Sequence, residues 1–213
     1  LDIAQPALQS YNELAWFDGA ADYVQLSDPY NHAVISISAW IYKTRYTDYE
    51  TIFSNRDDAE DGVRFSMYTA GELSVRLNGT TVTSAGTIPL GKWTHVAFTY
   101  DKTNIKLYIN GILDGTGSQT TDVDITASNS FIGRDSYSPQ YHYQGAITGV
   151  TIHSEGLTAS EILELYNDGK ELDATTFSGV DNIVGYFRNN GLSTWTDLSA
   201  NSNNGTPTSI TET

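Results

Sequence analysis

Hydrophobic and polar residues alternate along much of the chain, and the alternation is clearest between residues 92 and 115. From Ile105 to Asn110 every second residue is apolar, which is typical of a strand with one buried face. Trp93–Tyr100 is apolar on both faces, as in a central strand that is covered twice. Asn110-Gly111 favours a two-residue hairpin turn, because both residues tolerate positive φ angles. The pattern predicts paired strands at the centre of a layered fold.

The same period of two recurs in shorter segments on both sides of residues 92–115. These segments are Val34–Lys43, Thr51–Ser54, Val63–Tyr68, Leu73–Leu77, Phe131–Arg134 and Tyr143–His153. About ten short strands separated by turns are typical of a β-sandwich. We therefore expect an all-β fold, a two-sheet antiparallel β-sandwich of the jelly-roll type.

One segment near the C-terminal end has a helical pattern instead. Thr158 and Glu161 are spaced as a capping box, which marks a helix start. The apolar positions that follow share one helix face: Ile162, Leu165 and Tyr166. Gly169 is a natural stop. The pattern predicts one short C-terminal helix.

Several of these segments resemble laminin G-like jelly rolls of the concanavalin A-like lectin/glucanase group. The resemblance is carried by WFDGAADYV at Trp16–Val24, by VISISAWIYK at Val34–Lys43, and by WTHVA and KLYING within residues 93–111. Tyr143–His153 also matches, with Thr148 where an aspartate is usual. The resemblance implies a sandwich of the kind used by lectins, in which loops at the sheet edges hold ligands.

The last part of the chain resembles the segment that usually begins such a domain. Residues 183–206 carry this resemblance, although they come last here. Either they open a second, truncated repeat, or they return to the empty edge beside Trp16. An unpaired edge strand is a liability, so we expect the return. The chain is then a single domain, residues 1–213, with a core at 15–169 and a returning segment at 180–206.

The returning segment leads to specific packing expectations. A strand at Ile183–Arg188 should pair with an edge of the sandwich, with Ile183, Gly185 and Phe187 on one side. Trp195 and Leu198 should pack near Trp16–Phe17.

Composition narrows the possible partners. The 213 residues carry a net charge of −15, which disfavours nucleic acid and anionic membranes as partners. The chain has no cysteine, so disulfides and thiolate zinc sites are excluded. No run approaches the roughly 18 apolar residues that a membrane helix needs, so we expect no membrane insertion. Because the chain begins at Leu1 without methionine, we expect a processed product or an excised piece.

Two groups of carboxylates are candidate calcium sites. The first is the acidic loop at residues 55–62, with Asp57, Asp58 and Asp61. Calcium takes about six to eight oxygen ligands. The resemblance adds Asp135, because the related pentraxins bind calcium with acidic residues from two such loops. The second group is Asp18 with Asp22, beside an Asp-Gly turn. Acidic loops are more often simply solvated, so that alternative stays open.

The most unusual loop spans residues 134–143. Its candidate ligand-binding residues are Arg134, Asp135, Tyr137, Tyr141, His142 and Tyr143. Sugars are recognised by aromatic faces combined with groups that bond hydroxyls. The alternative is that two tyrosines fold back over the sandwich as a lid. A smaller set of the same chemistry lies at Arg45, Tyr46, Asp48 and Tyr49.

An enzymatic function is disfavoured. Glycosidases need two carboxylates that flank the scissile bond, and no predicted strand carries such a pair. His95 and His153 lie within strands without an evident catalytic partner, so we interpret them as structural. We expect a non-catalytic carbohydrate-binding or adhesion module, with Ca²⁺ as a candidate cofactor and a glycan as partner, acting extracellularly or on a virion or cell surface. The alternative is a structural or decoration domain of a larger virion or cell-surface assembly.

Overall fold

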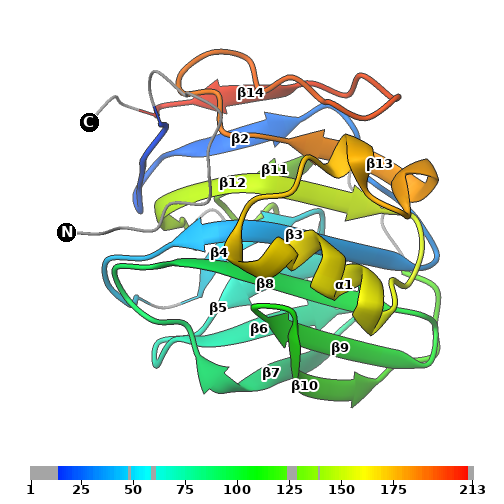
Figure 1. The fold of residues 1–213 in the computed structure, drawn as a ribbon. Helices are drawn as coiled ribbons and strands as arrows, with labels where there is room; N and C mark the ends of the chain where they lie inside the picture. Colours follow the sequence, from blue (N-terminus) through cyan, green and yellow to red (C-terminus); the bar gives the residue numbers. More distant parts are fainter. Residues whose placement is uncertain (1–13, 48, 59–60, 124–128, 139, 211–213) are drawn as a thin grey trace.

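The fold is a sandwich of two sheets. The computed structural model describes residues 14–47, 49–58, 61–123, 129–138 and 140–210. Within these residues each sheet has seven strands, and every pairing between neighbouring strands is antiparallel. The expected two-sheet antiparallel β-sandwich is therefore confirmed (Figure 1).

We call the first sheet the helix-side sheet, because the one α-helix of the described chain crosses its outer face (Figure 1). Its strands, in spatial order, are β1 (Phe17–Asp18), β12 (Gln144–His153), β3 (Ile35–Tyr42), β8 (Trp93–Tyr100), β9 (Asn104–Ile109) and β10 (Ile112–Ser118), with β13 (Ile183–Phe187) also paired to β12.

The second sheet is the loop-side sheet, because loops cover part of its outer face. Its strands, in spatial order, are β14 (Gly205–Thr208), β2 (Tyr23–Leu26), β11 (Ser130–Ile132), β4 (Glu50–Ser54), β5 (Val63–Met67), β6 (Glu72–Leu77) and β7 (Thr80–Thr87).

The main hydrophobic core lies between the sheets. On β5, Val63, Phe65 and Met67 are fully buried. Phe65 meets Phe98 of β8 with ring centroids 5.2 Å apart. The alternation that the sequence shows therefore sorts side chains into the core as predicted.

A second, smaller apolar cluster lies on the outer face of the helix-side sheet. Ala97 of β8 and Tyr108 of β9 pack there with Ile162 and Leu165 of α1 (Ala159–Tyr166). Strand β8 is thus covered on both faces, as its two-sided apolar pattern predicted. The Asn110-Gly111 turn that follows β9 has positive φ angles at both residues, 51° and 77°.

The helix begins and ends close to its predicted bounds. The capping box is present: the Glu161 amide donates to Thr158 Oγ1, and the Thr158 amide donates to the Glu161 carboxylate. The helix ends at Asn167, which adopts the left-handed conformation, two residues before Gly169. Three 3₁₀ turns follow: η1 (Asn167–Gly169), η2 (Ala174–Thr176) and η3 (Val180–Asn182).

The C-terminal segment contributes one strand to each sheet. β13 pairs with β12, and β14 pairs with β2. Trp195 is fully buried and packs edge-on against Phe17, with ring centroids 6.1 Å apart. Leu198 is 41% exposed, so the expectation that it packs near Trp16–Phe17 is wrong. That residues 1–213 act as one domain stays a prediction.

The predicted facing of β13 needs one correction. Phe187 lies in the main core, whereas Ile183 lies in the second cluster together with Tyr186. Gly185 pairs with Ile152 and Ile183 pairs with the next residue, His153, so the register shifts between them. This irregularity reverses the alternation before Gly185, and a single sequence does not reveal it.

The side chain of Asn189 links the segment just before β1 to the segment just after β13, at one edge of β12. β1 pairs with β12 at Gln144 and Gly145, and β13 pairs with the same edge from Val150 onward. The buried Asn189 side chain accepts from the Ala15 amide at 2.8 Å and donates to the carbonyls of Ala15 and Ile147. It therefore links the residue range before β1 to the one after β13, along the part of this β12 edge between Gly145 and Val150.

Candidate functional site

Four tyrosines gather on the outer face of the loop-side sheet, and we call Tyr49, Tyr68, Tyr137 and Tyr141 the tyrosine face. The Tyr49 ring centroid lies 4.9 Å from that of Tyr68 and 5.1 Å from that of Tyr141. These three side chains are half-buried, while Tyr137 is 50% exposed. The arrangement presents aromatic surface to solvent from the loop before β4, the end of β5 and the loop before β12.

Buried charges support the tyrosine face from beneath. Arg56 binds Asp135 with two nitrogens, Nη2 at 2.6 Å and Nε at 2.9 Å, and Arg64 Nη1 lies 3.5 Å from the same carboxylate. Asp135 is fully buried, and Ser54 Oγ donates to it at 3.0 Å. Burial lowers the pKa of Arg64, while Asp135 acts in the opposite direction. The carboxylate thus holds two guanidinium groups in fixed positions.

The two guanidinium groups lie directly under the tyrosine rings. Arg64 Cζ is 5.0 Å from the centroid of Tyr49 and 5.3 Å from that of Tyr141. Arg56 Cζ is 5.1 Å from the centroid of Tyr137. Cation–π contacts of this kind restrain ring orientation. All four tyrosines are therefore linked, directly or through one neighbour, to the Arg56–Asp135–Arg64 ion pairs.

The structure separates the six predicted ligand-binding residues into two sets. Tyr137 and Tyr141 lie on the tyrosine face, and Arg134 is half-buried with its guanidinium over the rings of Tyr23 and Phe131. Asp135 lies beneath this surface and has no exposed area.

Tyr143 and His142 were predicted to bind the ligand, but the structure buries both side chains. Tyr143 is fully buried, and its hydroxyl donates to the Tyr42 carbonyl at 3.2 Å, so it packs inward instead of meeting a ligand. His142 is 8% exposed and its Nδ1 lies 3.3 Å from the Asp22 carbonyl oxygen. Both side chains follow the start of β12 into the fold, away from the tyrosine face.

Sequence reasoning missed Arg56, Arg64 and Tyr68. The alternation of β5 contained a usable signal, because Arg64 and Tyr68 share the parity opposite to the buried Val63 and Phe65. Tyr49 belonged to the smaller predicted set, of which Asp48 lies outside the described residues. The pairing of Arg56 with Asp135 joins residues 79 positions apart and has no local signature.

A second buried ion pair lies near the start of β12. Lys43 Nζ is 2.5 Å from Glu50 Oε2, and both side chains are essentially inaccessible. The same ammonium group lies 4.3 Å from the centroid of Tyr143. Burial lowers the pKa of Lys43, and Glu50 opposes that shift. The ion pair and the Tyr143 ring are therefore in contact inside the fold.

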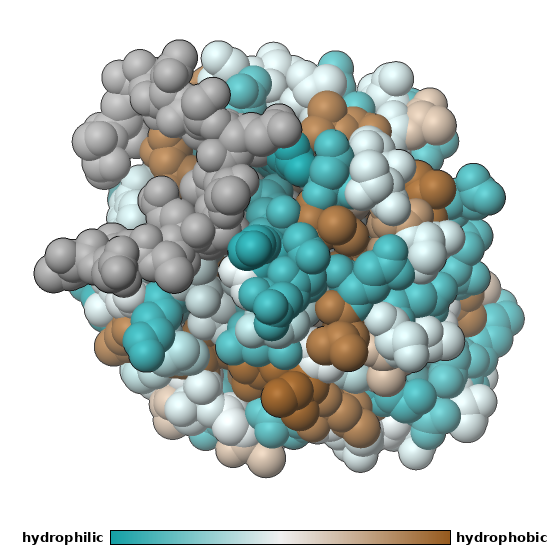
Figure 2. Space-filling view, in the orientation of Figure 1, coloured by the Kyte–Doolittle hydropathy of each residue, from teal (hydrophilic) through white to brown (hydrophobic). Residues whose placement is uncertain are grey.

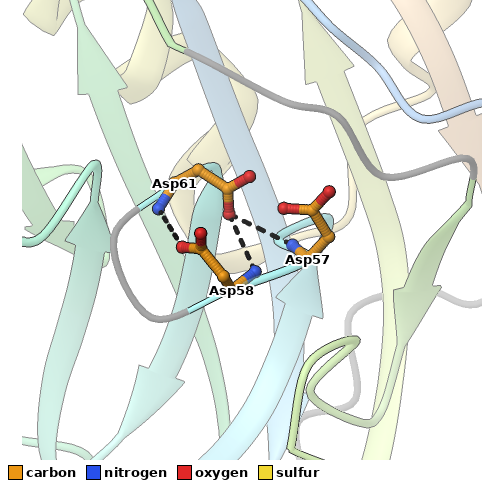
Figure 3. Close-up of side chains that lie close together, drawn as sticks. All are labelled: Asp57, Asp58 and Asp61. Atoms are coloured by element: carbon orange, nitrogen blue, oxygen red, sulfur yellow. Dashed lines mark hydrogen bonds between the residues drawn. The ribbon is translucent and has the colours of Figure 1, made fainter.

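The acidic loop brings three predicted metal-ligating residues together. Asp57, Asp58 and Asp61 each offer a carboxylate oxygen within 4.8 Å of the others, as Figure 3 shows. Asp61 Oδ1 accepts from the amides of Asp57 and Asp58, and Asp58 Oδ1 accepts from the Asp61 amide. Burial, with a contribution from Asp57, raises the pKa of Asp61. Three carboxylates with water fit a loose, exposed calcium site.

Asp135 is not part of this group among the described residues. The two loops do meet, because Ser136 Oγ donates to the Arg56 carbonyl, but the contact runs through Arg56 and not through paired carboxylates. The arrangement therefore differs from the two-loop calcium site that the pentraxin resemblance implied.

Asp18 and Asp22 lie together around the Asp-Gly turn. The Asp18 amide donates to Asp22 Oδ2 at 2.7 Å, and Asp18 Oδ1 accepts from the amides of Ala20 and Ala21. Burial raises the pKa of Asp22; the hydrogen bond from the Asp18 amide opposes this shift, and the Asp18 carboxylate adds to it. Burial also acts to raise the pKa of Asp18, but the amides of Ala20 and Ala21 outweigh it. The hydrogen bonds account for both carboxylates as parts of the turn.

His95 and His153 are structural, as predicted. Both are buried, and burial lowers the pKa of each to about 3. Among the described residues, moreover, no helix has the length and apolarity needed to cross a membrane.

Comparison with known proteins gives one family and several similar structures. A family model, described as the concanavalin A-like lectin/glucanases superfamily, matches residues 18–163. No curated protein sequence matches the chain.

Three solved structures share the fold. A candidate carbohydrate-binding protein from Bacteroides ovatus superposes with a TM-score of 0.72 at 17% identity, covering 94% of this chain. This chain spans 60% of that protein's length. A heptameric SAP-like pentraxin from Limulus polyphemus gives a TM-score of 0.60 at 17% identity, covering 74% of this chain and 83% of the pentraxin.

The third structure is domain 4 of AbnA, an extracellular GH43 arabinanase from Geobacillus stearothermophilus, in complex with arabinotriose. It gives a TM-score of 0.57 at 26% identity and covers 72% of this chain and 76% of its own.

Proposed function

Because the chain belongs to the concanavalin A-like lectin/glucanases superfamily, we propose that it is a non-catalytic module that binds carbohydrate through the tyrosine face. The observation that carries this proposal is the set of four tyrosines placed over the buried Arg56–Asp135–Arg64 ion pairs. Aromatic faces pack against the C–H surface of a sugar ring, and phenol hydroxyls bond its hydroxyl groups. A preorganised aromatic surface loses little conformational freedom on binding.

The similar structures support the ligand class. Domain 4 of the arabinanase, 26% identical to this chain, was solved in complex with arabinotriose, an oligosaccharide. That domain is part of an extracellular enzyme, which agrees with a module that works outside a cell or on a particle surface. Adhesion to a glycan-bearing surface is the role that such a module would serve.

Calcium belongs to the proposal as an accessory ion. Asp57, Asp58 and Asp61 would supply carboxylate oxygens, and water would complete the shell. Bound there, calcium would neutralise charge in the loop that follows Arg56. It would help to fix that loop beside the tyrosine face.

The test is a glycan array followed by calorimetric titration with the oligosaccharides that bind. Tyr137→Ala and Tyr141→Ala should each weaken binding about 5- to 100-fold, since one aromatic contact contributes about 1–3 kcal/mol in comparable stacking sites. Tyr42→Ala is the matched control, because Tyr42 is a half-buried tyrosine of the helix-side sheet. Unchanged affinity in both tyrosine-face variants would show that this face does not bind the glycan. The purified protein should also release no reducing sugar from the polysaccharides that it binds.

A further inference from the structure

A pocket of about 310 Å³, with polar side chains along part of its lining, lies between the loop that connects β2 to β3 and the C-terminal segment from β13 onward. Its lining includes Asp28, Tyr30, His32, Val184, Asn201 and Asn203. The last three lie beyond residues 18–163, the part of the chain that matches the family model. The returning tail therefore builds one wall of a pocket that the matched segment alone would leave open.

The walls of this pocket are fixed by hydrogen bonds from several elements. Asp28 Oδ1 accepts from the Tyr30 amide at 2.6 Å, and Asp28 Oδ2 accepts from Asn203 Nδ2 at 3.1 Å. Ser130 Oγ of β11 donates to the Asp28 carbonyl, and Asn55 Nδ2 donates to the Pro29 carbonyl. The pocket is therefore held in shape before any ligand arrives.

Tyr30 adopts an unusual backbone conformation in this wall. Its φ is +52°, in the left-handed region that bulky residues rarely occupy. Strained residues of this kind persist where the surrounding structure holds them, and they concentrate at ligand sites. Tyr30 is 1% exposed, and its ring packs edge-on against Phe53. The strained backbone of Tyr30 therefore forms part of the pocket wall.

The polar side of the pocket is rich in hydrogen-bond acceptors. The amide nitrogens of Asn201 and Asn203 donate to the Val184 carbonyl and to Asp28, which directs each Oδ1 to other donors. Burial lowers the pKa of His32, although Asp28 opposes the shift, so the neutral ring offers one donor and one acceptor. A ligand that satisfies this lining must donate several hydrogen bonds, as a polyhydroxylated molecule does.

The remaining lining selects further among ligands. Pro29, Tyr30 and Val184 add apolar surface to the lining beside these polar groups. Among the residues that the structure describes, the lining contains a carboxylate and neither lysine nor arginine, which disfavours phosphate, sulfate and uronate groups. The volume lies at the lower end of the range of small-molecule pockets, about 300–1,000 Å³. One ring fits this size better than an extended chain.

We propose that this pocket is a second ligand site, which takes one neutral sugar ring at the end or at a branch of a glycan. The proposal rests on the proposed function for its ligand class, carbohydrate, but not for its residues. With sites on the tyrosine face and in this pocket, one module would contact a branched glycan twice or bridge two chains.

The test is amide chemical-shift mapping of the ¹⁵N-labelled full chain. The probes are arabinose, galactose, glucose, N-acetylglucosamine and arabinotriose, each added separately, with calcium alone as a further titration. We expect at least one sugar to shift the amides of residues 28–32 and 201–203. Asn201→Ala and His32→Ala should each weaken that binding at least 10-fold. Tyr141→Ala should leave it unchanged.

The outcomes separate the two sites. Sugar-induced shifts confined to the tyrosine face would overturn the pocket and keep the proposed function. Shifts confined to the pocket, abolished by Asn201→Ala, would support the pocket and overturn the tyrosine face. If no probe shifts residues 28–32 and 201–203, or if calcium alone reproduces the shifts, the pocket is not a sugar site. Circular dichroism of each variant establishes that a loss of binding is not a loss of folding.

Discussion

The two outer faces of the sandwich are covered in different ways. On the helix-side sheet, the Tyr166 ring of α1 lies against the rings of Trp40 and His95, and an apolar cluster packs between α1 and the sheet. Figure 1 shows α1 crossing this face. Figure 2 views the molecule from this side, where hydrophobic side chains gather in patches over α1 and its neighbours. On the loop-side sheet the cover is tyrosines over buried ion pairs.

We interpret the difference as a division between a face that stabilises the fold and a face that, in our proposal, binds the ligand. Apolar burial contributes about 25 cal/mol for each Å² removed from water. A buried ion pair contributes little net stability compared with apolar residues of the same size, because both charges lose their hydration. The ion pairs of Arg56, Asp135 and Arg64 are therefore poorly explained by stability alone. We interpret them as a means of fixing the tyrosine rings.

The largest effect should come from removing the tail that completes the apolar cover. Deleting residues 170–213 takes away β13, β14 and Trp195, and it exposes the edges of β12 and β2. We expect the truncated chain to aggregate or to lose its cooperative melt, measured by size-exclusion chromatography and calorimetry. Leu198→Ser, at an exposed tail position, should melt normally. A truncated chain that stays monomeric and melts as before would place the domain end at α1.

The second prediction concerns the Arg56–Asp135–Arg64 ion pairs beneath the tyrosine face. Asp135→Asn leaves two buried guanidinium groups without their carboxylate, which should cost about 3–5 kcal/mol of unfolding free energy. Urea denaturation at pH 7 measures this loss. Asp57→Asn is the control, because Asp57 is exposed, and it should change stability by less than about 0.5 kcal/mol. A loss below about 1 kcal/mol for Asp135→Asn would mean that the guanidinium groups find other partners.

The third prediction concerns the helix-side face, which should lose stability at acidic pH. His95 and His153 have pKa values of about 3 in the folded chain, below the ordinary 6.5, because both are buried. The unfolded chain therefore takes up protons first as the pH falls below 6.5. Each histidine should reduce stability by about 1.4 kcal/mol per pH unit between roughly pH 6 and pH 4.

Urea denaturation as a function of pH checks this prediction. His153→Gln should reduce the pH dependence in that window, and His32→Gln, at a half-buried loop position, should reduce it less. An equal slope in wild type and His153→Gln would show that His153 takes up its proton while the chain is folded.

The smallest expected effect is that of calcium binding to the acidic loop at Asp57, Asp58 and Asp61. Three exposed or half-buried carboxylates make a weak site, so calcium at about ten times its Kd should add about 1.4 kcal/mol. A chelator should lower the Tm of wild type slightly and that of Asp61→Asn not at all. The same small shift in both proteins would place the ion elsewhere.

The sequence predicted the two faces unequally well. The apolar pattern on both faces of β8 and the capping box at Thr158 and Glu161 are local patterns, and local patterns determine burial and helix bounds directly. The apolar face of α1 followed from the same kind of signal. The part of the helix-side cover that β8 and α1 supply was therefore predictable, whereas the facing of β13 was not.

The loop-side cover was not. Tyr141 and Tyr143 are two residues apart in one loop, yet one is half-exposed and the other fully buried. Tyr143 contacts Lys43, which pairs with Glu50, and both residues come from another part of the chain. The partnership of Asp135 with Arg56 and Arg64 is likewise long-range. Such contacts depend on the completed fold, and alternation carries no information about them.

The late position of β13 and Asn189 in the sequence also determines when the edge of β12 can be paired during synthesis. The edge of β12 from Val150 to His153 gains its partner only when β13 has been made, and Asn189 then bonds the Ile147 carbonyl. At about 5–20 residues per second, the ribosome needs roughly 2–7 s to add Ser154 to Asn189. During that interval the nascent chain displays an unpaired strand edge, which is when a chaperone or a neighbouring nascent chain would compete for it. We expect the yield of correctly folded protein to depend on how quickly this stretch is translated.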